Sequence, residues 1–124
     1  DTSGSMSAKQ IGMALGSIAS YAAAKDVPFV RIIFCDAKAT DAGYLAPEDI
    51  AGRVKVTGRG GTILQPGVDC LEQANDFPKD GPILIITDGE IENDLKVRRE
   101  HAFLLPRGNR LPFRARGEVF YFRE

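Results

Sequence analysis

The sequence predicts an α/β domain in which helices cover both faces of a mainly parallel sheet. Strongly apolar runs rich in β-branched residues, typical of buried parallel strands, recur along the chain. Segments with helical spacing of apolar residues lie between them, and right-handed crossovers place such helices on both faces of a sheet. The 124 residues suffice for one core, so we expect a single domain over residues 1–124.

The first helix is predicted to begin after Ser7. Ser7 and Gln10 have the spacing of a capping box, and Met6 and Ile11 occupy the positions of a hydrophobic staple. The helical pattern stops before Pro28. Apolar residues at helical spacing predict one buried face, formed by Ile11, Leu15, Ile18 and Ala22.

Three further helices are predicted, each from a different sequence signal. Proline and acidic first-turn residues indicate a short helix at Pro47 to Asp49. Pro66 opens a second one, which has Val68, Leu71 and Ala74 on one side. Residues 93–100 are a weaker helical candidate.

Five strands are predicted: interior ones at residues 29–35, 82–87 and 102–105, and edge strands at 54–56 and 118–122. One element is missing from this pattern, because a buried strand should precede the capped helix at Ser7. The sequence instead opens with the turn residues 1–5. We therefore expect the first, central strand to lie upstream of Asp1, which leaves the domain N-terminally incomplete.

Composition narrows the class of protein. Hydrophobic residues make up 44% and charged residues 27%, a balance that excludes disordered, collagen-like and disulfide-scaffold proteins. No apolar run approaches the roughly 20 residues of a membrane helix. The formal net charge of −1 indicates no overall attraction to polyanions.

Cys35 and Cys70 lie in apolar segments without C-x-x-C spacing, which favours buried free thiols and a cytoplasmic protein.

Oxygen-bearing side chains follow three of the predicted strands. They are Asp1, Ser3 and Ser5 after the expected upstream strand, Thr62 after the 54–56 strand, and Asp88 after the 82–87 strand. Ligands bind at the carboxyl ends of strands in open α/β sheets, so these loops are expected at one edge. Two carboxylates balance the charge of a hard divalent cation, and hydroxyls add ligands without adding charge. The pattern predicts a metal site.

These residues resemble a known motif. The sequence D-T-S-G-S from Asp1 to Ser5, the G-G-T ending at Thr62 and the T-D-G around Asp88 are similar to the metal-ion-dependent adhesion site of von Willebrand factor A (vWA) domains. The resemblance covers nearly the whole chain. It implies a Rossmann-like three-layer fold in which Ser3, Ser5 and Thr62 bind the metal directly, and Asp1 and Asp88 bind it directly or through water.

The resemblance also implies a function. A vWA-like domain is a protein-binding module rather than an enzyme, and its divalent cation (Mg²⁺, or Mn²⁺ or Ca²⁺) docks an acidic residue of a partner protein. The compact size resembles short bacterial intracellular members of the family. We therefore expect a cytoplasmic protein whose partner supplies a carboxylate, with no membrane or nucleic-acid partner.

Two alternatives stay open. A Mg²⁺-dependent phosphoryl-transfer enzyme could use Asp1 or Asp88 as its nucleophile, although no lysine lies inside the three motif loops. A nucleic-acid module could use the basic C-terminal segment. Its four arginines are more simply read as a solvated loop: Arg107, Arg110, Arg114 and Arg116.

Four other polar residues receive structural interpretations. Asp36, Asp41 and Glu90 could line the edge with the metal site but are predicted to be solvated loop residues, Asp36 being the best candidate of the three because it follows a strand directly. His101 has no His or Cys at ligand spacing, so it is expected to make a structural hydrogen bond.

Overall fold

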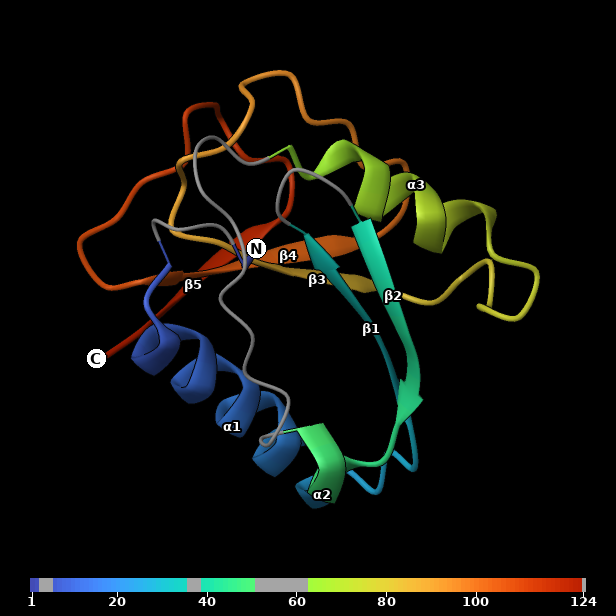
Figure 1. The fold of residues 1–124 in the computed structure, drawn as a ribbon. Coiled ribbons are helices and arrows are strands. Elements are labelled where there is room, and N and C mark those ends of the chain that lie inside the picture. Colours follow the sequence, from blue (N-terminus) through green and yellow to red (C-terminus); the bar gives the residue numbers. More distant parts are fainter. Residues whose placement is uncertain (3–5, 36–38, 51–62, 124) are drawn as a thin grey trace.

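A computed structural model describes residues 1–2, 6–35, 39–50 and 63–123, and in these ranges the chain is a mixed α/β protein (Figure 1). The helices and strands follow one another in the order α1 (Ala8–Ala24), β1 (Val30–Cys35), β2 (Ala39–Leu45), α2 (Pro47–Ile50), α3 (Gln65–Gln73), β3 (Ile83–Ile86), β4 (His101–Pro106) and β5 (Glu118–Phe122). The predicted strand at 54–56 lies outside the described residues.

The strands of the described ranges form two separate sheets. One is three-stranded and parallel in the order β3-β4-β5, as the apolar runs predict, with β5 at an edge and β4 in the middle. The other is a two-stranded antiparallel sheet of β1 and β2. Residues 29–35 were predicted to be an interior strand of the parallel sheet, but in the described ranges β1 pairs antiparallel with β2. Strand β2 was not predicted.

The local helix signals are confirmed. The Ser7 hydroxyl accepts a hydrogen bond from the Gln10 amide at 3.0 Å, and the Gln10 side chain accepts one from the Ser7 amide at 3.0 Å. Of the predicted buried face, Ile11, Leu15 and Ala22 are buried and Ile18 is half-buried. α2 and the proline-opened α3 also form. Residues 93–100 are not helical, so that prediction is wrong.

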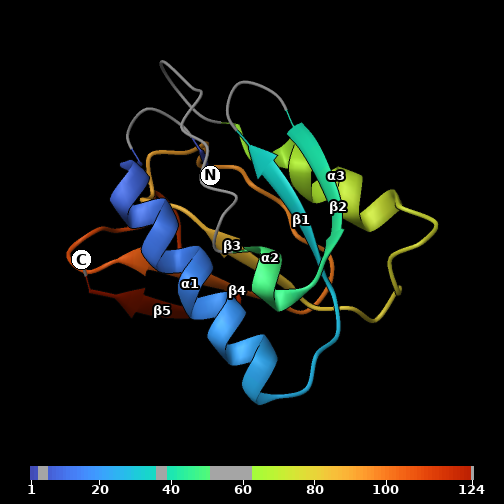
Figure 2. The same ribbon diagram turned by 60° about the horizontal axis from the view of Figure 1, so that its bottom comes forward.

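The helices lie on opposite sides of the strands. α1 and α2 are on one side and α3 is on the other, and the second view agrees with the first (Figures 1 and 2). Each side has its own buried cluster. The α1 cluster contains Met6, Ile11, Leu15, Leu45 and Ile50, whereas the α3 cluster contains Cys35, Leu64, Val68, Ile83, Ile85, Phe103 and Leu105. Both sides of β1 and β3 therefore meet apolar side chains.

An ion pair joins β1 to β2 and explains part of the unexpected antiparallel pairing. The Arg31 guanidinium donates two hydrogen bonds to the Asp41 carboxylate and lies 2.7 Å from a carboxylate oxygen of Asp76. Asp41 thus lies in a strand, which corrects its interpretation as a solvated loop residue, although the residue is exposed. The hydrogen bonds from the Arg31 guanidinium hold the pKa of the Asp41 carboxyl below its ordinary value; burial opposes this shift, and the Gly43 amide adds to it.

We expect Asp41→Asn to change the pH dependence of stability. Because the folded-state pKa is lowered, the contribution of this carboxylate is complete above the unfolded value of about 3.9 and is lost as the pH falls through the folded value. The variant should melt below the wild type at pH 7, and the difference should shrink below pH ~4. Melting curves from pH 2 to 7, with the exposed Asp80→Asn as control, check this. A difference that does not vary with pH would contradict it.

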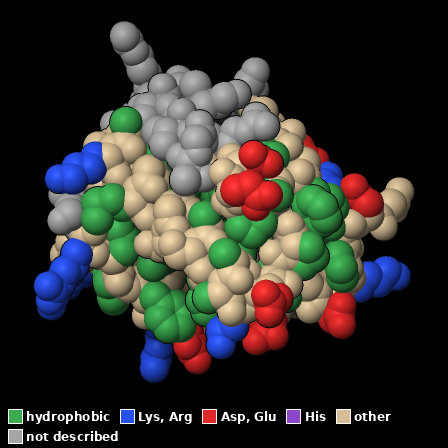
Figure 3. Space-filling model, turned by 90° about the horizontal axis from the view of Figure 1, so that it is seen from below, with side chains coloured by type: hydrophobic (Ala, Val, Ile, Leu, Met, Phe, Trp, Pro, Cys, Tyr) green, Lys and Arg blue, Asp and Glu red, His purple; other side chains and the backbone are tan. Residues whose placement is uncertain are grey.

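The predictions for His101, the cysteines and the C-terminal arginines can also be compared with the structure. His101 Nδ1 lies 2.8 Å from the Arg99 carbonyl oxygen, as the structural interpretation requires. Cys35 is buried, and Cys70 is a half-buried free thiol. The four arginines of the C-terminal segment are exposed. On the face seen from below, acidic and basic side chains are interspersed rather than gathered (Figure 3). No described helix has the length and apolarity to cross a membrane.

Candidate metal site at the strand ends

The N-terminal dipeptide lies between the carboxyl ends of β1 and β3 (Figure 1). The Asp1 nitrogen donates a hydrogen bond to the Ile86 carbonyl oxygen at 2.9 Å. The Thr2 amide donates to the Cys35 carbonyl oxygen at 2.7 Å. The first two residues therefore contact the last residue of each strand and connect the two sheets at this edge.

Thr87 fixes the orientation of the Asp1 carboxylate. Its hydroxyl donates to Asp1 Oδ2 at 2.7 Å and accepts a hydrogen bond from the Gly89 amide at 3.1 Å. Thr87 is fully buried, so this hydroxyl has little freedom to turn away. Thr87 was not predicted as a site residue, although its place between the apolar run of β3 and Asp88 was a usable signal.

Asp88 is buried, and the turn around it is held by several hydrogen bonds. Its Oδ1 accepts from the Glu90 amide at 3.0 Å, and its carbonyl oxygen accepts from the Asn109 side chain at 2.8 Å. Gly89 has a φ of +92°, in the left-handed region that favours glycine. The bond to Glu90 engages one carboxylate oxygen, so Oδ2 can serve as a ligand.

The Asp1 α-amino group is buried at this edge of the strands. Burial lowers the pKa of this group, while the negative charges of Cys35 and Asp88 act in the opposite direction.

Glu92 joins the loop after Asp88 to the start of α3. Its Oε1 and Oε2 each lie 2.9 Å from the Leu64 nitrogen, and Oε2 also accepts from the Gln65 amide at 2.9 Å. The Gln65 side chain exchanges two hydrogen bonds with the Lys96 backbone, at 2.9 and 2.8 Å. Thr62 precedes Leu64 by two residues. Glu92 therefore holds the beginning of this helix against the Asp88 loop.

Glu92→Ala should destabilise the protein by about 1–2 kcal/mol, the usual cost of removing a helix N-terminal cap. The reason is that α3 has no hydrogen-bonding cap from its own N-cap residue, Leu64. Chemical denaturation measures the loss. Glu90→Ala, which removes an exposed side chain two residues earlier, is the control and should stay within about 0.5 kcal/mol of the wild type. Equal losses in the two variants would contradict the capping role.

The predicted ligands fall into two groups. Asp1 and Asp88 lie at the same edge, and the Thr87 hydroxyl connects Asp1 to the residue next to Asp88. The other three predicted ligands lie outside the described residues: Ser3, Ser5 and Thr62. Asp36 lies outside them as well. Glu90 is exposed, in agreement with its interpretation as a solvated loop residue. In the described ranges, no three side chains of the His, Cys, Asp and Glu types gather as a metal-binding group. A metal here would need the hydroxyl ligands.

Comparison of the chain with protein-family models, with curated proteins and with solved structures found no match.

Proposed function

We propose that this protein is a metal-dependent protein-binding module whose Rossmann-like, vWA-like domain holds a divalent cation between Asp1 and Asp88. The observation that carries the proposal is the hydrogen-bonded connection of Asp1 to Thr87, the residue next to Asp88. Residues 87 positions apart in the chain thus supply carboxylates to one edge, at the strand ends where open α/β sheets bind ligands.

The chemistry of these groups suits a hard cation such as Mg²⁺. Both residues carry oxygen ligands, and the fixed hydrogen bonds of Thr87 and Glu90 hold the carboxylates in place before a metal arrives. Ser3, Ser5 and Thr62 are the proposed hydroxyl ligands. Neutral hydroxyls would leave the cation electrophilic, so that a carboxylate of a partner protein could bind it.

The metal is tested by melting the protein in a Mg²⁺ or Mn²⁺ titration. A ligand that binds only the folded state stabilises it by about 2.7 kcal/mol at a hundred times its dissociation constant, so the melting temperature should rise with metal concentration. Asp88→Asn should abolish this rise. The asparagine keeps an oxygen for the Glu90 amide, and it removes the repulsion with Asp1, so the metal-free variant should remain folded.

Asp80→Asn is the matched control for that titration. It makes the same change of charge at an exposed turn position, so it should keep the full response to metal. A melting temperature that stays constant in the wild type, or an equal response in wild type and Asp88→Asn, would refute the proposed site.

The open coordination position is tested separately with Mn²⁺ and acetate. Water bound to protein-held Mn²⁺ relaxes solvent protons, and a carboxylate that takes a position on the metal displaces such water. Acetate should therefore lower the relaxation enhancement of the Mn²⁺ complex, and acetamide should not. Binding of Mn²⁺ without any effect of acetate would leave a metal site but contradict its role in docking a carboxylate.

A further inference from the structure

β5 lies at the edge of the parallel sheet, and within the described ranges no strand pairs with its outer side (Figure 2). The Phe122 carbonyl oxygen accepts a hydrogen bond from the Arg107 amide at 2.8 Å, so the backbone groups of Phe122 face β4. Because backbone groups alternate along a strand, the N–H and C=O groups of Val119 and Tyr121 point outward. These groups are placed to pair with a further strand.

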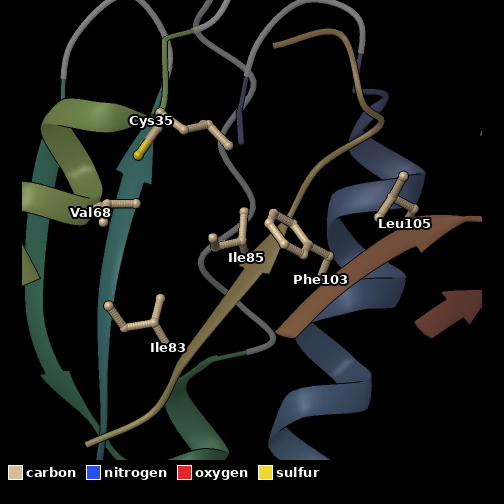
Figure 4. Close-up of a cluster of buried hydrophobic side chains, with 7 residues drawn as sticks. Cys35, Val68, Ile83, Ile85, Phe103 and Leu105 are labelled. Carbon is tan, nitrogen blue, oxygen red and sulfur yellow. The ribbon is translucent and has the colours of Figure 1, made fainter. Parts of the chain in front are cut away.

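The apolar cover of the sheet ends between β4 and β5. Phe103 and Leu105 of β4 belong to the α3 cluster and are 1% and 0% exposed (Figure 4). Their register partners on the same face of β5 are Val119 and Tyr121. Val119 is half-buried against the cluster, whereas Tyr121 is 55% exposed, and Phe120 on the opposite face is 50% exposed. The outer part of β5 is therefore open on both faces.

The sequence of β5 does not protect this edge from pairing. Edge strands are commonly protected by charged residues, by proline or by a covering segment. From Val119 to Phe122, however, every side chain is aliphatic or aromatic. Such an edge is suited to β-augmentation, in which an extended peptide adds a strand to a sheet.

Arginines surround a groove beside this edge. The groove, of about 730 Å³, lies between β5 and the loop that follows β4, and its lining includes Arg107, Arg110 and Arg123, all of them exposed. Tyr121 lines the same groove, and none of the described lining residues is acidic. A strand paired with β5 would therefore place every second side chain next to three positive charges.

Hydrogen bonds hold the arginine-bearing loop in place. The Arg107 amide is bonded to Phe122 of β5, and the Asn109 amide donates to the Pro106 carbonyl oxygen at 3.1 Å. The Asn109 side chain donates to the Asp88 carbonyl oxygen at 2.8 Å. The loop is thus fixed to β5 on one side and to the Asp88 turn on the other, so its arginines are positioned before a partner arrives.

Other occupants fit this surface less well. Single-stranded nucleic acid stacks successive bases on aromatic rings beside basic groups. Phe120 and Tyr121 are consecutive in a strand, so their rings lie on opposite faces and do not form one stacking surface. A second copy of β5 would bring Val119, Tyr121 and Arg123 to the face of the groove, and none of these is a carboxylate. The arginines are best matched by an acidic strand.

We propose that the outer edge of β5 binds an extended acidic segment of a partner protein by β-augmentation. The segment pairs with the backbone of Val119 and Tyr121 along the five residues of β5. Its alternate side chains are acidic and face the three arginines, and the side chains between them are apolar and contact Phe120. The inference goes beyond the proposed function, because this surface contains neither Asp1 nor Asp88 and needs no metal.

The probe for the test is a capped six-residue peptide in which Glu and Val alternate. A peptide of alternating Lys and Val is the control for charge, and an oligonucleotide of eight thymidines tests for nucleic-acid binding. Calorimetry measures binding to the 124-residue chain in EDTA and again in Mg²⁺. Residue-resolved amide exchange is measured with and without a saturating amount of the Glu/Val peptide, and sedimentation reports whether the protein is monomeric.

The Glu/Val peptide should bind equally in EDTA and in Mg²⁺, and the Lys/Val peptide should not bind. The bound Glu/Val peptide should slow exchange at the Val119 and Tyr121 amides at least about 10-fold. The Phe120 and Phe122 amides are the internal reference, because alternation points them toward β4. They should already be protected without the peptide.

A pair of double variants tests the role of the arginines. Arg107→Ala/Arg110→Ala should weaken binding of the Glu/Val peptide about 10-fold, because two ion pairs are lost. Arg98→Ala/Arg114→Ala removes the same charge at exposed positions outside the groove, so it should change the affinity less than about 2-fold. Equal losses in the two variants would contradict the role of the groove.

A pair of substitutions at Tyr121 tests the backbone pairing. Tyr121→Pro removes an amide that points away from β4, a position at which an edge strand tolerates proline, and it should abolish binding of the Glu/Val peptide. Tyr121→Ala keeps the amide and should retain measurable binding. Undiminished binding to a folded Tyr121→Pro variant would contradict the pairing.

Further results would overturn the proposal. One is the absence of binding in EDTA; if binding then appeared in Mg²⁺, the acidic peptide would belong to the metal site. Equal binding of the Lys/Val peptide would mean that the arginines do not select the partner. Binding that leaves Val119 and Tyr121 unprotected would exclude an added strand, and tighter binding of the oligonucleotide would assign the surface to nucleic acid.

Protection of the Val119 and Tyr121 amides without any peptide would also overturn it. If that protection disappeared on dilution, the edge would pair with a second copy of the chain. If it persisted in the monomer, another segment of the same chain would occupy the edge.

Discussion

Replacing Gly89 with alanine should destabilise the protein by about 3 kcal/mol or more and lower its melting temperature by about 10 °C or more. A Cβ at this position would lie 1.8 Å from the Arg110 carbonyl oxygen and 2.8 Å from its carbon. Both are backbone atoms, so no side-chain rotation relieves the clash. The φ of +92° adds strain of its own for any residue with a side chain. Thermal melting measures the total.

Gly108→Ala separates the clash from the backbone strain. Gly108 has nearly the same φ, +94°, but a Cβ there would have no atom within 4 Å. Its alanine variant should therefore lose only about 1–2 kcal/mol, the cost of a left-handed conformation for an ordinary residue. If the two variants lost the same amount, the close approach of Gly89 to Arg110 would not be a feature of the folded protein.

Gly89 also connects stability to the proposed metal site. It directly follows Asp88, and its amide donates to Thr87, which in turn orients Asp1. A shift of this turn would move both carboxylates. In Gly89→Ala molecules that remain folded, we therefore expect a smaller stabilisation by Mg²⁺ than in the wild type, whereas Gly108→Ala should respond fully.

The elements that sequence analysis predicted are those encoded by neighbouring residues. The capping box of Ser7 and Gln10 fixes the start of α1 through contacts three residues apart. The strands of the parallel sheet are continuous apolar runs, which need no knowledge of their partners to be recognised. The turn at Asp88 was also predictable, because it directly follows such an apolar run.

The elements that were missed depend on distant contacts. Strand β2 contains Asp41 and Gly43, which are uncommon in strands, and it is held by pairing with β1 and by Arg31. Residues 93–100 have a helical pattern, but the Lys96 backbone bonds to Gln65 instead. The roles of Thr87 and Glu92 likewise appear only when residues far apart in sequence are brought together.

Gly67→Ala should destabilise the wild-type protein yet stabilise the Cys35→Ala variant. Gly67 lies in the first turn of α3, where a Cβ would be 2.3 Å from the Cys35 sulfur. Cys35 is buried among the side chains of the α3 cluster, so its sulfur has little room to move. Overpacking of a buried contact costs about 1–3 kcal/mol, which exceeds the roughly 0.5–1 kcal/mol that alanine gains over glycine in a helix.

Removing the sulfur reverses the balance between those two effects. In the Cys35→Ala background the nearest remaining atom outside residue 35 is a methyl carbon of Ile33 at 3.4 Å, an ordinary contact, so only the helix preference of alanine remains. The cost of Cys35→Ala itself cancels in a double-mutant cycle, which should give a coupling of about 1–3 kcal/mol. The free energies of unfolding of the four proteins measure it. An effect of the same sign in both backgrounds would show that α3 does not lie this close to the end of β1.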